Sequence, residues 1–203
     1  MNRGNVKPSE RRAIIVASGP SASNFSPPPD TTIIAVNGAI EWLSHADYFF
    51  TLDPSAANLK RLAHRRSGVR YCVAGFQAED AQIFERVCRT NKPEPTETFS
   101  PEWWMWRLKA VPGLCTTPGK IHTGNSAWGA LGLAYHLGFN HVALTGVDAT
   151  DEPRIEGGNS KCLSHLPLLF ASARPQINVV SLGKLNSVPQ YTLHDWLEMS
   201  APT

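Results

Sequence analysis

Short polar motifs follow runs of apolar, β-branched residues at several points in the chain. Ser18, Gly19 and Ser21 lie in the first of them, a Ser-Gly-Pro-Ser turn after residues 13–17. A turn of this kind suits a phosphate, because its backbone N–H groups point outward and no side chain blocks the approach. A branched side chain at Gly19 would crowd that approach. The alternative is an ordinary tight turn, because the chain lacks the G-x-x-x-x-G-K-[ST] and G-x-G-x-x-G motifs.

Three further polar residues carry groups that suit the remainder of a nucleotide. Asn37, before Gly38, offers both a donor and an acceptor to a ribose or a base edge. Asp53, in an Asp-Pro-Ser motif, offers an acceptor for sugar hydroxyls or a ligand for Mg²⁺. Asp148 ends a Gly-Val-Asp turn. Each has a structural alternative, since Asn-Gly is a common turn pair and aspartates often cap helices, so the inference depends on their shared position after strands.

Residues 123–126, Thr-Gly-Asn-Ser, precede a run of small residues and predict the beginning of a helix. The partial positive charge of such an N-terminus suits a second phosphate or a carboxylate, and simple N-capping is the alternative.

Other side chains suit the same ligand. Basic groups that could balance phosphate charge, or be solvated surface residues, are Lys120, Arg154 and Lys161. A tryptophan cluster could stack on a base or a sugar ring, or serve core packing or a subunit interface, and its members are Trp103, Trp104 and Trp106.

The elements that must position these residues follow from the apolar pattern. Strands are predicted at residues 13–17, 32–36, 48–52, 69–73, 141–145 and 177–181. Helices are predicted up to about residue 43, after Asp53 with Leu59, Leu62 and Ala63 on its inner face, and at 78–89, 123–137, 161–173 and 192–198. Asp53 is expected to cap its helix, and Pro167 to interrupt the helix at 161–173. Alternating strands and helices predict a single α/β domain, a doubly wound, mostly parallel sheet with helices on both faces. The motifs then meet at the carboxyl ends of the strands.

The domain organisation expected from this pattern is simple. Residues 1–12 form an N-terminal tail, 13–183 the α/β domain, and 184–203 a C-terminal tail with a short helix. Within the domain, residues 90–118 lack periodicity and are rich in proline and tryptophan. Such a long insertion indicates a lid or a subunit contact, and a homo-oligomer is one expectation.

Composition excludes several classes of protein. The 203 residues are 42% hydrophobic and 18% charged, which is typical of one globular domain. A net charge of +2 gives no basic excess, so nucleic acid is not the expected partner. The chain has no apolar run long enough for a membrane span and no signal-peptide pattern, so a cytoplasmic location is expected. The four cysteines, Cys72, Cys88, Cys115 and Cys162, include no C-x-x-C pair and are expected to be reduced and mostly buried.

The order of the motifs resembles a known group of enzymes. The chain is similar to the bacterial sialyltransferases of glycosyltransferase family 42. The motifs that carry the resemblance are Val-Ala-Ser-Gly-Pro-Ser (16–21), Ala-Val-Asn-Gly (35–38), Ala-Asp-Tyr-Phe-Phe-Thr-Leu-Asp-Pro-Ser (46–55), Thr-Gly-Asn-Ser-Ala (123–127) and Leu-Gly-Phe-Asn-His-Val-Ala-Leu-Thr-Gly-Val-Asp (137–148). They also resemble the wider relatives of that family, the flagellin-modifying motility accessory factors and a pterin pyrophosphokinase. The resemblance spans residues 13–181 and leaves the tryptophan-rich insertion outside.

The resemblance implies a glycosyltransferase that uses a nucleotide-activated sugar, a CMP-sugar, and an unidentified acceptor. The residues it assigns to the nucleotide are Ser18, Gly19, Ser21, Asn37, Asp53, Ser55, Thr123, Gly124 and Asp148. Two alternatives stay open. One is an ATP-dependent pyrophosphokinase in which Asp53 and Asp148 place Mg²⁺, and the other is a catalytically silent nucleotide-binding module.

The chain departs from the sialyltransferase pattern at two places. The sialyltransferases carry a catalytic histidine in a His-Ser-Lys segment, where this chain has Asn-Ser-Lys at residues 159–161. His165 and His122 are the replacement candidates for the general base, with a surface or capping role as the alternative for each. The second departure is an aspartate at position 53 in place of asparagine, which is similar to the wider relatives and permits a metal ion.

Overall fold

The structure is a computed structural model that describes residues 11–90, 92–157 and 163–199. Its strands are β1 (Arg12–Val16), β2 (Thr32–Val36), β3 (Tyr48–Thr51), β4 (Arg70–Ala74), β5 (Gln82–Val87), β6 (Lys120–His122), β7 (His141–Thr145) and β8 (Asn178–Ser181). Its helices are η1 (Pro20–Ala22, a 3-10 turn), α1 (Ala39–Trp42), α2 (Ala56–Ala63), α3 (Pro101–Arg107), α4 (Ser126–His136), α5 (Leu166–Ala173) and α6 (Leu193–Glu198). Within these ranges, no helix combines the length and the apolar character that crossing a membrane requires.

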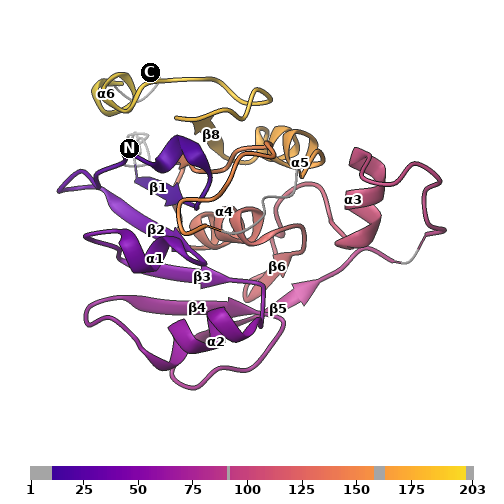
Figure 1. Ribbon diagram of the computed structural model, residues 1–203, viewed down its shortest axis with the longest axis horizontal. Helices are drawn as coiled ribbons and strands as arrows, with labels where there is room; N and C mark the ends of the chain where they lie inside the picture. The colour runs from indigo at the N-terminus through magenta and orange to yellow at the C-terminus, as the bar shows by residue number, and fades with distance from the viewer. Residues whose placement is uncertain (1–10, 91, 158–162, 200–203) are drawn as a thin grey trace, which may run out of the picture.

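The strands of the described residues form one eight-stranded sheet in the order β6-β5-β4-β3-β2-β1-β7-β8 (Figure 1). Every pairing is parallel, and β1 pairs with β2 on one side and β7 on the other. The order therefore reverses between β1 and β7. In an open parallel sheet, the crevice at such a reversal is where ligands bind. The predicted doubly wound α/β fold is confirmed.

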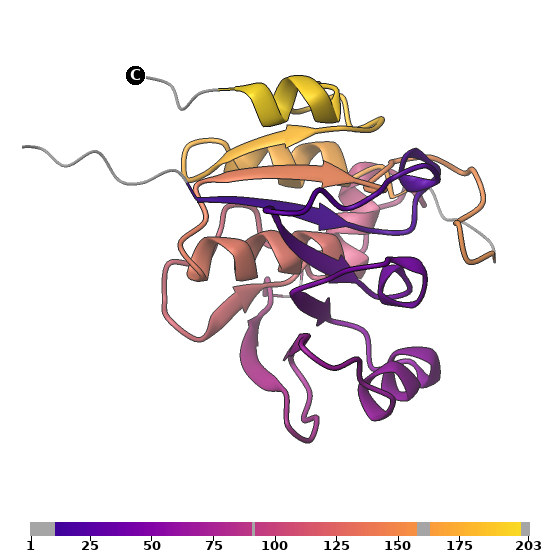
Figure 2. The same ribbon diagram turned by 90° about the vertical axis from the view of Figure 1, so that its left-hand side faces the viewer.

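The central strands are buried on both faces because helices cover both. In β1, Ile15 packs into a core with α4 and α5, and Ile14 packs into a core with α1, α2 and α6. Figure 2 shows α1 and α2 on one side of the sheet and α4 on the other. Gly129 lets α4 approach closely, since a Cβ there would lie 2.5 Å from the Phe50 ring. This close packing of the helices on both faces holds the strands, and therefore their carboxyl ends, in fixed positions.

The predicted helix at residues 78–89 is wrong, because this segment forms the strand β5. Only Phe84 is buried within β5, and the other side chains of the strand are exposed or partly exposed. That pattern looked amphipathic, but the backbone groups of β5 pair with β4 and with β6, a short strand the sequence pattern did not reveal. The consequence for the site is that Arg86 and Cys88 lie at the carboxyl end of a strand.

The insertion at 90–118 folds partly into the main body. Ser100 caps α3 by accepting a hydrogen bond from the Trp103 N–H at 3.1 Å. Met105, Ala110 and Leu114 belong to the core that α4 and α5 share. Figure 1 shows α3 and its flanking loops at one end of the molecule, beyond α4 and α5.

Two helix ends differ from the expectation. Ser55, not Asp53, is the N-cap residue of α2, and the buried face of α2 carries Asn58 and Leu62 while Leu59 is 46% exposed. The helix α5 begins at Leu166, so Pro167 lies in its first turn, where a missing N–H costs nothing, and does not interrupt it. Of the predicted helix at 161–173, residues 161 and 162 lie outside the described residues.

The segment after β8 also packs on the domain. Leu185 and Val188 join one core, and Trp196 of α6 joins the other. Arg12 of β1 donates to the Trp196 and Leu197 carbonyls, at 2.8 and 3.0 Å, and its guanidinium lies over the Trp196 ring. The first strand and the last helix of the described chain therefore hold each other in place.

Candidate functional site

The carboxyl ends of β1, β2, β3 and β7 and the N-terminus of α4 surround a cavity of about 680 Å³, which we call the strand-end pocket. This volume suits a small-molecule ligand. Seven of the residues predicted to bind a nucleotide line the pocket, namely Ser18, Gly19, Asn37, Asp53, Thr123, Gly124 and Asp148. The other two, Ser21 and Ser55, do not line it. Ser55 is the N-cap residue of α2.

Ser21 and Asp148 join three turns of the chain. Asp148 Oδ2 accepts the Ser21 N–H at 2.9 Å, and Asp148 Oδ1 accepts the Lys184 N–H at 3.1 Å. Ser21 Oγ in turn accepts the Gly146 N–H at 2.9 Å. These bonds tie the turn after β1 to the turn after β7 and to the segment after β8. The side chains of Ser21 and Asp148 therefore hold the walls of the pocket in place.

The contact between the turns after β1 and β7 requires glycine at position 19. A Cβ at this position would lie 2.6 Å from the Gly146 carbonyl oxygen and 2.6 Å from Asp148 Oδ2. The turns after β1 and β7 touch here, and the Gly19 N–H donates to the Gly146 carbonyl at 2.9 Å. A branched side chain at Gly19 would therefore disturb this contact before it met any phosphate.

Ser18 carries a hydroxyl that the protein leaves unpaired. The residue lines the pocket and is 8% exposed, and its Oγ is buried without a hydrogen-bond partner in the described structure. A buried polar group without a partner is costly, and because Ser18 borders the cavity, a turn of its side chain about the Cα–Cβ bond would bring the hydroxyl to a ligand there.

Asn37 and Asp53 are held by a residue that sequence reasoning missed. The buried Asn58 Nδ2 lies 3.3 Å from Asn37 Oδ1 and 3.3 Å from Asp53 Oδ2, and it also donates to the Asp53 carbonyl at 3.0 Å. Asn58 Oδ1 accepts from Arg61 at 2.7 Å. Asn37 has a positive φ of 52°, which asparagine tolerates better than most residues. Asn58 therefore fixes both side chains at the ends of β2 and β3.

The N-terminus of α4 faces the pocket and is capped. Asn125 Oδ1 accepts the Trp128 N–H at 2.8 Å, as in a simple N-cap. Ser126 Oγ accepts the Leu52 N–H at 3.2 Å and so ties α4 to the end of β3. Thr123 to Ala127 line the pocket in succession. Capping is thus observed, and the helix end still points its partial positive charge at the cavity.

Basic side chains form a further wall of the pocket, which we call the basic wall. Arg86 at the end of β5, Arg107 at the end of α3, and Lys109 after it line the pocket. None of the three has an ion-pair partner among the described residues. The sequence pattern does not reveal this wall, because it predicts a helix over residues 78–89, where the structure has β5. The lining also carries four carboxylates, those of Asp53, Asp148, Glu152 and Glu156, so an anion would find its favourable charge at these cations and not across the whole pocket.

Of the basic residues that the sequence suggested, Arg154 lines the pocket. Lys120 lies at the opposite, amino end of β6, where it pairs with Glu85 at 2.8 Å. Lys161 lies outside the described residues, as does the whole Asn-Ser-Lys segment. Residues 150–156 form the outer wall, where the Ile155 N–H donates to the Ser18 carbonyl at 2.9 Å.

His165 is not in the pocket. Its side chain has no exposed surface, both ring nitrogens lack a hydrogen-bond partner, and the ring stacks on Trp104 with centroids 6.3 Å apart. Burial lowers the pKa of His165 from 6.5 to about 4. His165 precedes α5 and is fully buried, whereas the next residue, Leu166, lines the pocket. An acceptor has no path to this ring.

His122 also lies outside the lining of the pocket. It ends β6, and its Nδ1 lies 2.8 Å from the Gly113 carbonyl oxygen. The following residue, Thr123, lines the pocket and donates from Oγ1 to the Leu108 carbonyl at 3.3 Å. In this structure His122 fastens the insertion to the sheet.

A metal ion would find few protein ligands. Among the described residues no three His, Cys, Asp or Glu side chains are grouped as a metal site. Both carboxylate oxygens of Asp148 accept backbone N–H groups, and Asp53 Oδ1 accepts the Ser55 N–H at 3.1 Å. A Mg²⁺ ion here would take its other ligands from phosphates and water.

The cysteines match the expectation in part. Cys72 and Cys115 are buried, and burial raises the pKa of Cys72 to about 12. Cys88 is exposed and lines the pocket. Cys162 lies outside the described residues.

Comparison with known proteins found no match to this chain among protein-family models, curated proteins or solved structures. The resemblance to the sialyltransferases therefore stays a hypothesis that depends on the motifs and their order.

Proposed function

We propose that the strand-end pocket binds a nucleotide-activated sugar, a CMP-sugar, and that the chain is a glycosyltransferase. The observation that carries the nucleotide site is a single pocket lined by Ser18, whose hydroxyl has no partner, by the capped N-terminus of α4, and by cations without ion-pair partners among the described residues. The motif order supplies the class of reaction, because it resembles enzymes that transfer sugars.

The parts of the pocket suit different parts of the donor. Ser18, the N-terminus of α4 and the basic wall suit phosphate, and Asn37 and Asp53 suit the ribose. In the transfer, the acceptor hydroxyl oxygen would bond to the anomeric carbon as the bond from that carbon to the phosphate oxygen breaks. The nucleotide would leave with the electron pair, stabilised by the fixed positive charges, and the hydroxyl proton would pass to the phosphate of the departing nucleotide or to water.

A catalytically silent nucleotide-binding module is the second candidate, and a specific observation favours it. Neither His165 nor His122 lines the pocket, so no histidine of the described residues is placed to accept the proton of an acceptor hydroxyl. Release of CMP from a CMP-sugar separates the two candidates, because a silent module binds the donor and leaves it intact.

The first experiment is calorimetric titration with CMP, CDP, UDP, ADP and ATP, each with and without Mg²⁺. Binding of a cytidine nucleotide without metal supports the proposal. A requirement for ATP and Mg²⁺ would instead favour pyrophosphoryl transfer, the other reaction that the motifs suggest.

The matched variants are Ser18→Ala and Ser23→Ala, since Ser23 is an exposed residue just after η1 that lies outside the pocket lining. Ser18→Ala is expected to weaken nucleotide binding about tenfold, the effect of one hydrogen bond to a charged group, without lowering the free energy of unfolding. Ser23→Ala should change neither quantity. Equal nucleotide affinity in the unchanged protein, Ser18→Ala and Ser23→Ala would exclude Ser18 from the site.

A further inference from the structure

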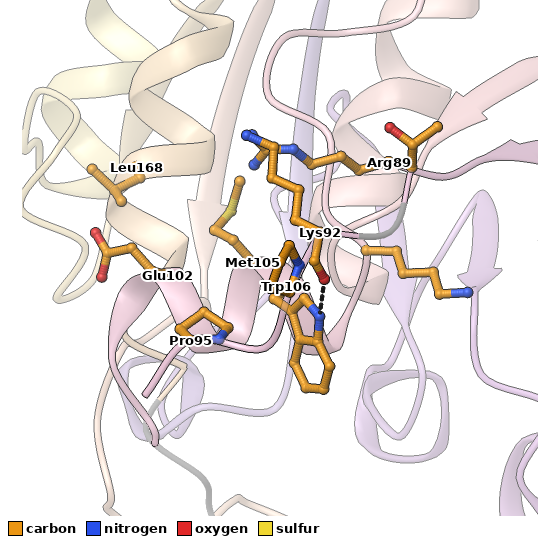
Figure 3. A pocket seen from close by; sticks show the side chains of 10 residues that line it. Arg89, Lys92, Pro95, Glu102, Met105, Trp106 and Leu168 are labelled. Atoms are coloured by element: carbon orange, nitrogen blue, oxygen red, sulfur yellow. Dashed lines mark hydrogen bonds between the residues drawn. The ribbon is translucent and has the colours of Figure 1, made fainter. Parts of the chain in front are cut away.

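A second cavity lies in the insertion and is distinct from the strand-end pocket. Its volume is about 330 Å³, and we call it the insertion pocket. Its apolar wall includes Met105, Trp106 and Leu168. Leu168, on α5, is 53% exposed, a large apolar side chain with no cover in the described structure. Figure 3 shows Leu168 and Glu102 on one side of the cavity and Arg89 and Lys92 on the other.

The charged part of the insertion pocket is mostly positive. Arg89, Lys92 and Lys109 line it, and within the described ranges none of their side chains has an ion-pair partner. Glu102 is the acidic residue of the lining. An occupant with an apolar body and a negative charge would therefore complement both walls.

The walls of the insertion pocket are held by hydrogen bonds within the insertion. The Trp106 indole N–H donates to the Lys92 carbonyl at 2.8 Å, the dashed line in Figure 3, and the Arg89 N–H donates to the Lys109 carbonyl at 3.0 Å. The neighbouring Trp103 indole donates to Glu94 at 3.0 Å. These bonds fasten the proline-rich segment before α3 to α3 and to the residues after it, so the cavity exists without a ligand.

The two pockets are neighbours. Lys109 lines both of them, and the adjacent residues Cys88 and Arg89 line one each. A molecule in the insertion pocket would thus lie next to the phosphate-binding wall of the strand-end pocket. That is where a second substrate must lie to meet the donor.

We propose that the insertion pocket binds the second substrate, a small molecule with an apolar or aromatic body and a carboxylate or phosphate group. The aromatic or aliphatic body packs on Met105, Trp106 and Leu168, and the anion meets Arg89, Lys92 and Lys109. The role as second substrate site rests on the proposed function, whereas the binding of such an anion does not.

The test uses phenyl phosphate and phenylacetate as probes, with benzyl alcohol and inorganic phosphate as the two halves of the ligand. Binding is followed by the indole N–H signals of the ¹⁵N-labelled chain, in which Trp106→Phe identifies the signal of Trp106. At least one of the two aromatic anions should shift the Trp106 signal and bind about tenfold more tightly than either half, because each half meets only one wall. The stronger of the two tells whether the site prefers a carboxylate or a phosphate.

Leu168→Asp provides the matched variant, and Leu59→Asp its control. Both leucines are exposed, at 53% and 46%, and Leu59 of α2 lines neither cavity. A carboxylate at position 168 should weaken the aromatic anion about tenfold or more by repulsion, and one at position 59 should not. The inference would be overturned if neither aromatic anion shifted the Trp106 indole N–H signal. It would also be overturned if Leu168→Asp and Leu59→Asp bound the aromatic anion with equal affinity.

Nucleotide titrations separate this inference from the proposed function. If the anion binds and no nucleotide does, the proposed function fails and the insertion pocket remains a binding site. If nucleotides bind and displace the aromatic anion competitively, the pocket holds part of the nucleotide, and the second-substrate assignment is overturned. Simultaneous binding of both supports it.

Discussion

At the residue scale, the polar motifs serve the fold and the pocket together. Ser21 and Asp148 were expected to contact a ligand, and the structure uses both to tie turns to one another. Ser18 has the opposite character, because its hydroxyl contributes no hydrogen bond to the described structure. The strongest candidate contact with a ligand is therefore the residue whose side chain does least for the fold.

Sequence patterns could find the residues after strands but not their support. Asn58 lies four residues before Leu62 on the buried face of α2, and a polar residue on an apolar face is the only signal that marks it. Its contact with Asn37 joins positions 21 residues apart, which local spacing does not reveal. The burial of His165 likewise depends on Trp104, a residue of the insertion.

His165 predicts an acid-sensitive fold. Its pKa is lowered from 6.5 to about 4 by burial, so between these values the unfolded chain binds a proton that the folded chain does not. The free energy of unfolding should therefore fall as the pH falls from 6.5 to 4, by about 3 kcal/mol at most, and not rise. Urea unfolding at several pH values measures this. In His165→Leu that part of the pH dependence should vanish, whereas the exposed His64→Gln should keep it. A His165→Leu protein with the original slope would refute the prediction.

At the element scale, the strands that could be predicted from the sequence are those whose side chains are buried on both faces of the sheet. The six predicted strands are apolar on both faces in the sheet, so their runs stand out, and each matches a strand to within about one residue. In contrast, β5 carries a single buried side chain, and β6 is three residues long. Neither β5 nor β6 leaves an apolar run in the sequence. The helices cover both faces of the central strands but not both faces of these two strands.

The sequence pattern predicts that the insertion is a lid or a subunit contact, and it leaves core packing open for the tryptophan cluster. Met105, Ala110 and Leu114 instead extend the core beneath α4 and α5. Removal of residues 90–118 is therefore expected to expose apolar surface and to cost cooperative folding.

Adjacent tryptophans of α3 test this role. Trp104 is 6% exposed and packs on His165, whereas Trp103 is half-buried near the surface. Trp104→Ala should lower the free energy of unfolding by about 3–5 kcal/mol through lost burial and a cavity, and Trp103→Ala by about 1 kcal/mol. Denaturant unfolding of the two variants measures the difference. Similar small losses in both would mean that α3 is peripheral to the fold.

At the scale of the whole molecule, the site depends on contacts between distant parts of the chain. The strand-end pocket takes residues from position 17 to position 166, and the reversal of strand order between β1 and β7 brings its two sides together. The sequence pattern predicted this meeting, because the carboxyl ends of parallel strands share one edge. It did not predict the basic wall, which needs the strand β5 and the end of α3.

The ends of the described chain give the last prediction. Trp196 is 2% exposed in the core that α1 and α2 share, and its ring lies under the guanidinium of Arg12. Trp196→Ala should therefore cost about 3–5 kcal/mol of unfolding free energy, although the residue lies in a segment that the sequence pattern treated as a tail. The neighbouring Leu197, 37% exposed, is the control, and Leu197→Ala should cost about 1 kcal/mol or less. Because β1 carries the Ser18 turn at its other end, nucleotide titration of Trp196→Ala also shows whether α6 supports the pocket. Unchanged stability in Trp196→Ala would show that α6 is an appendage of the domain.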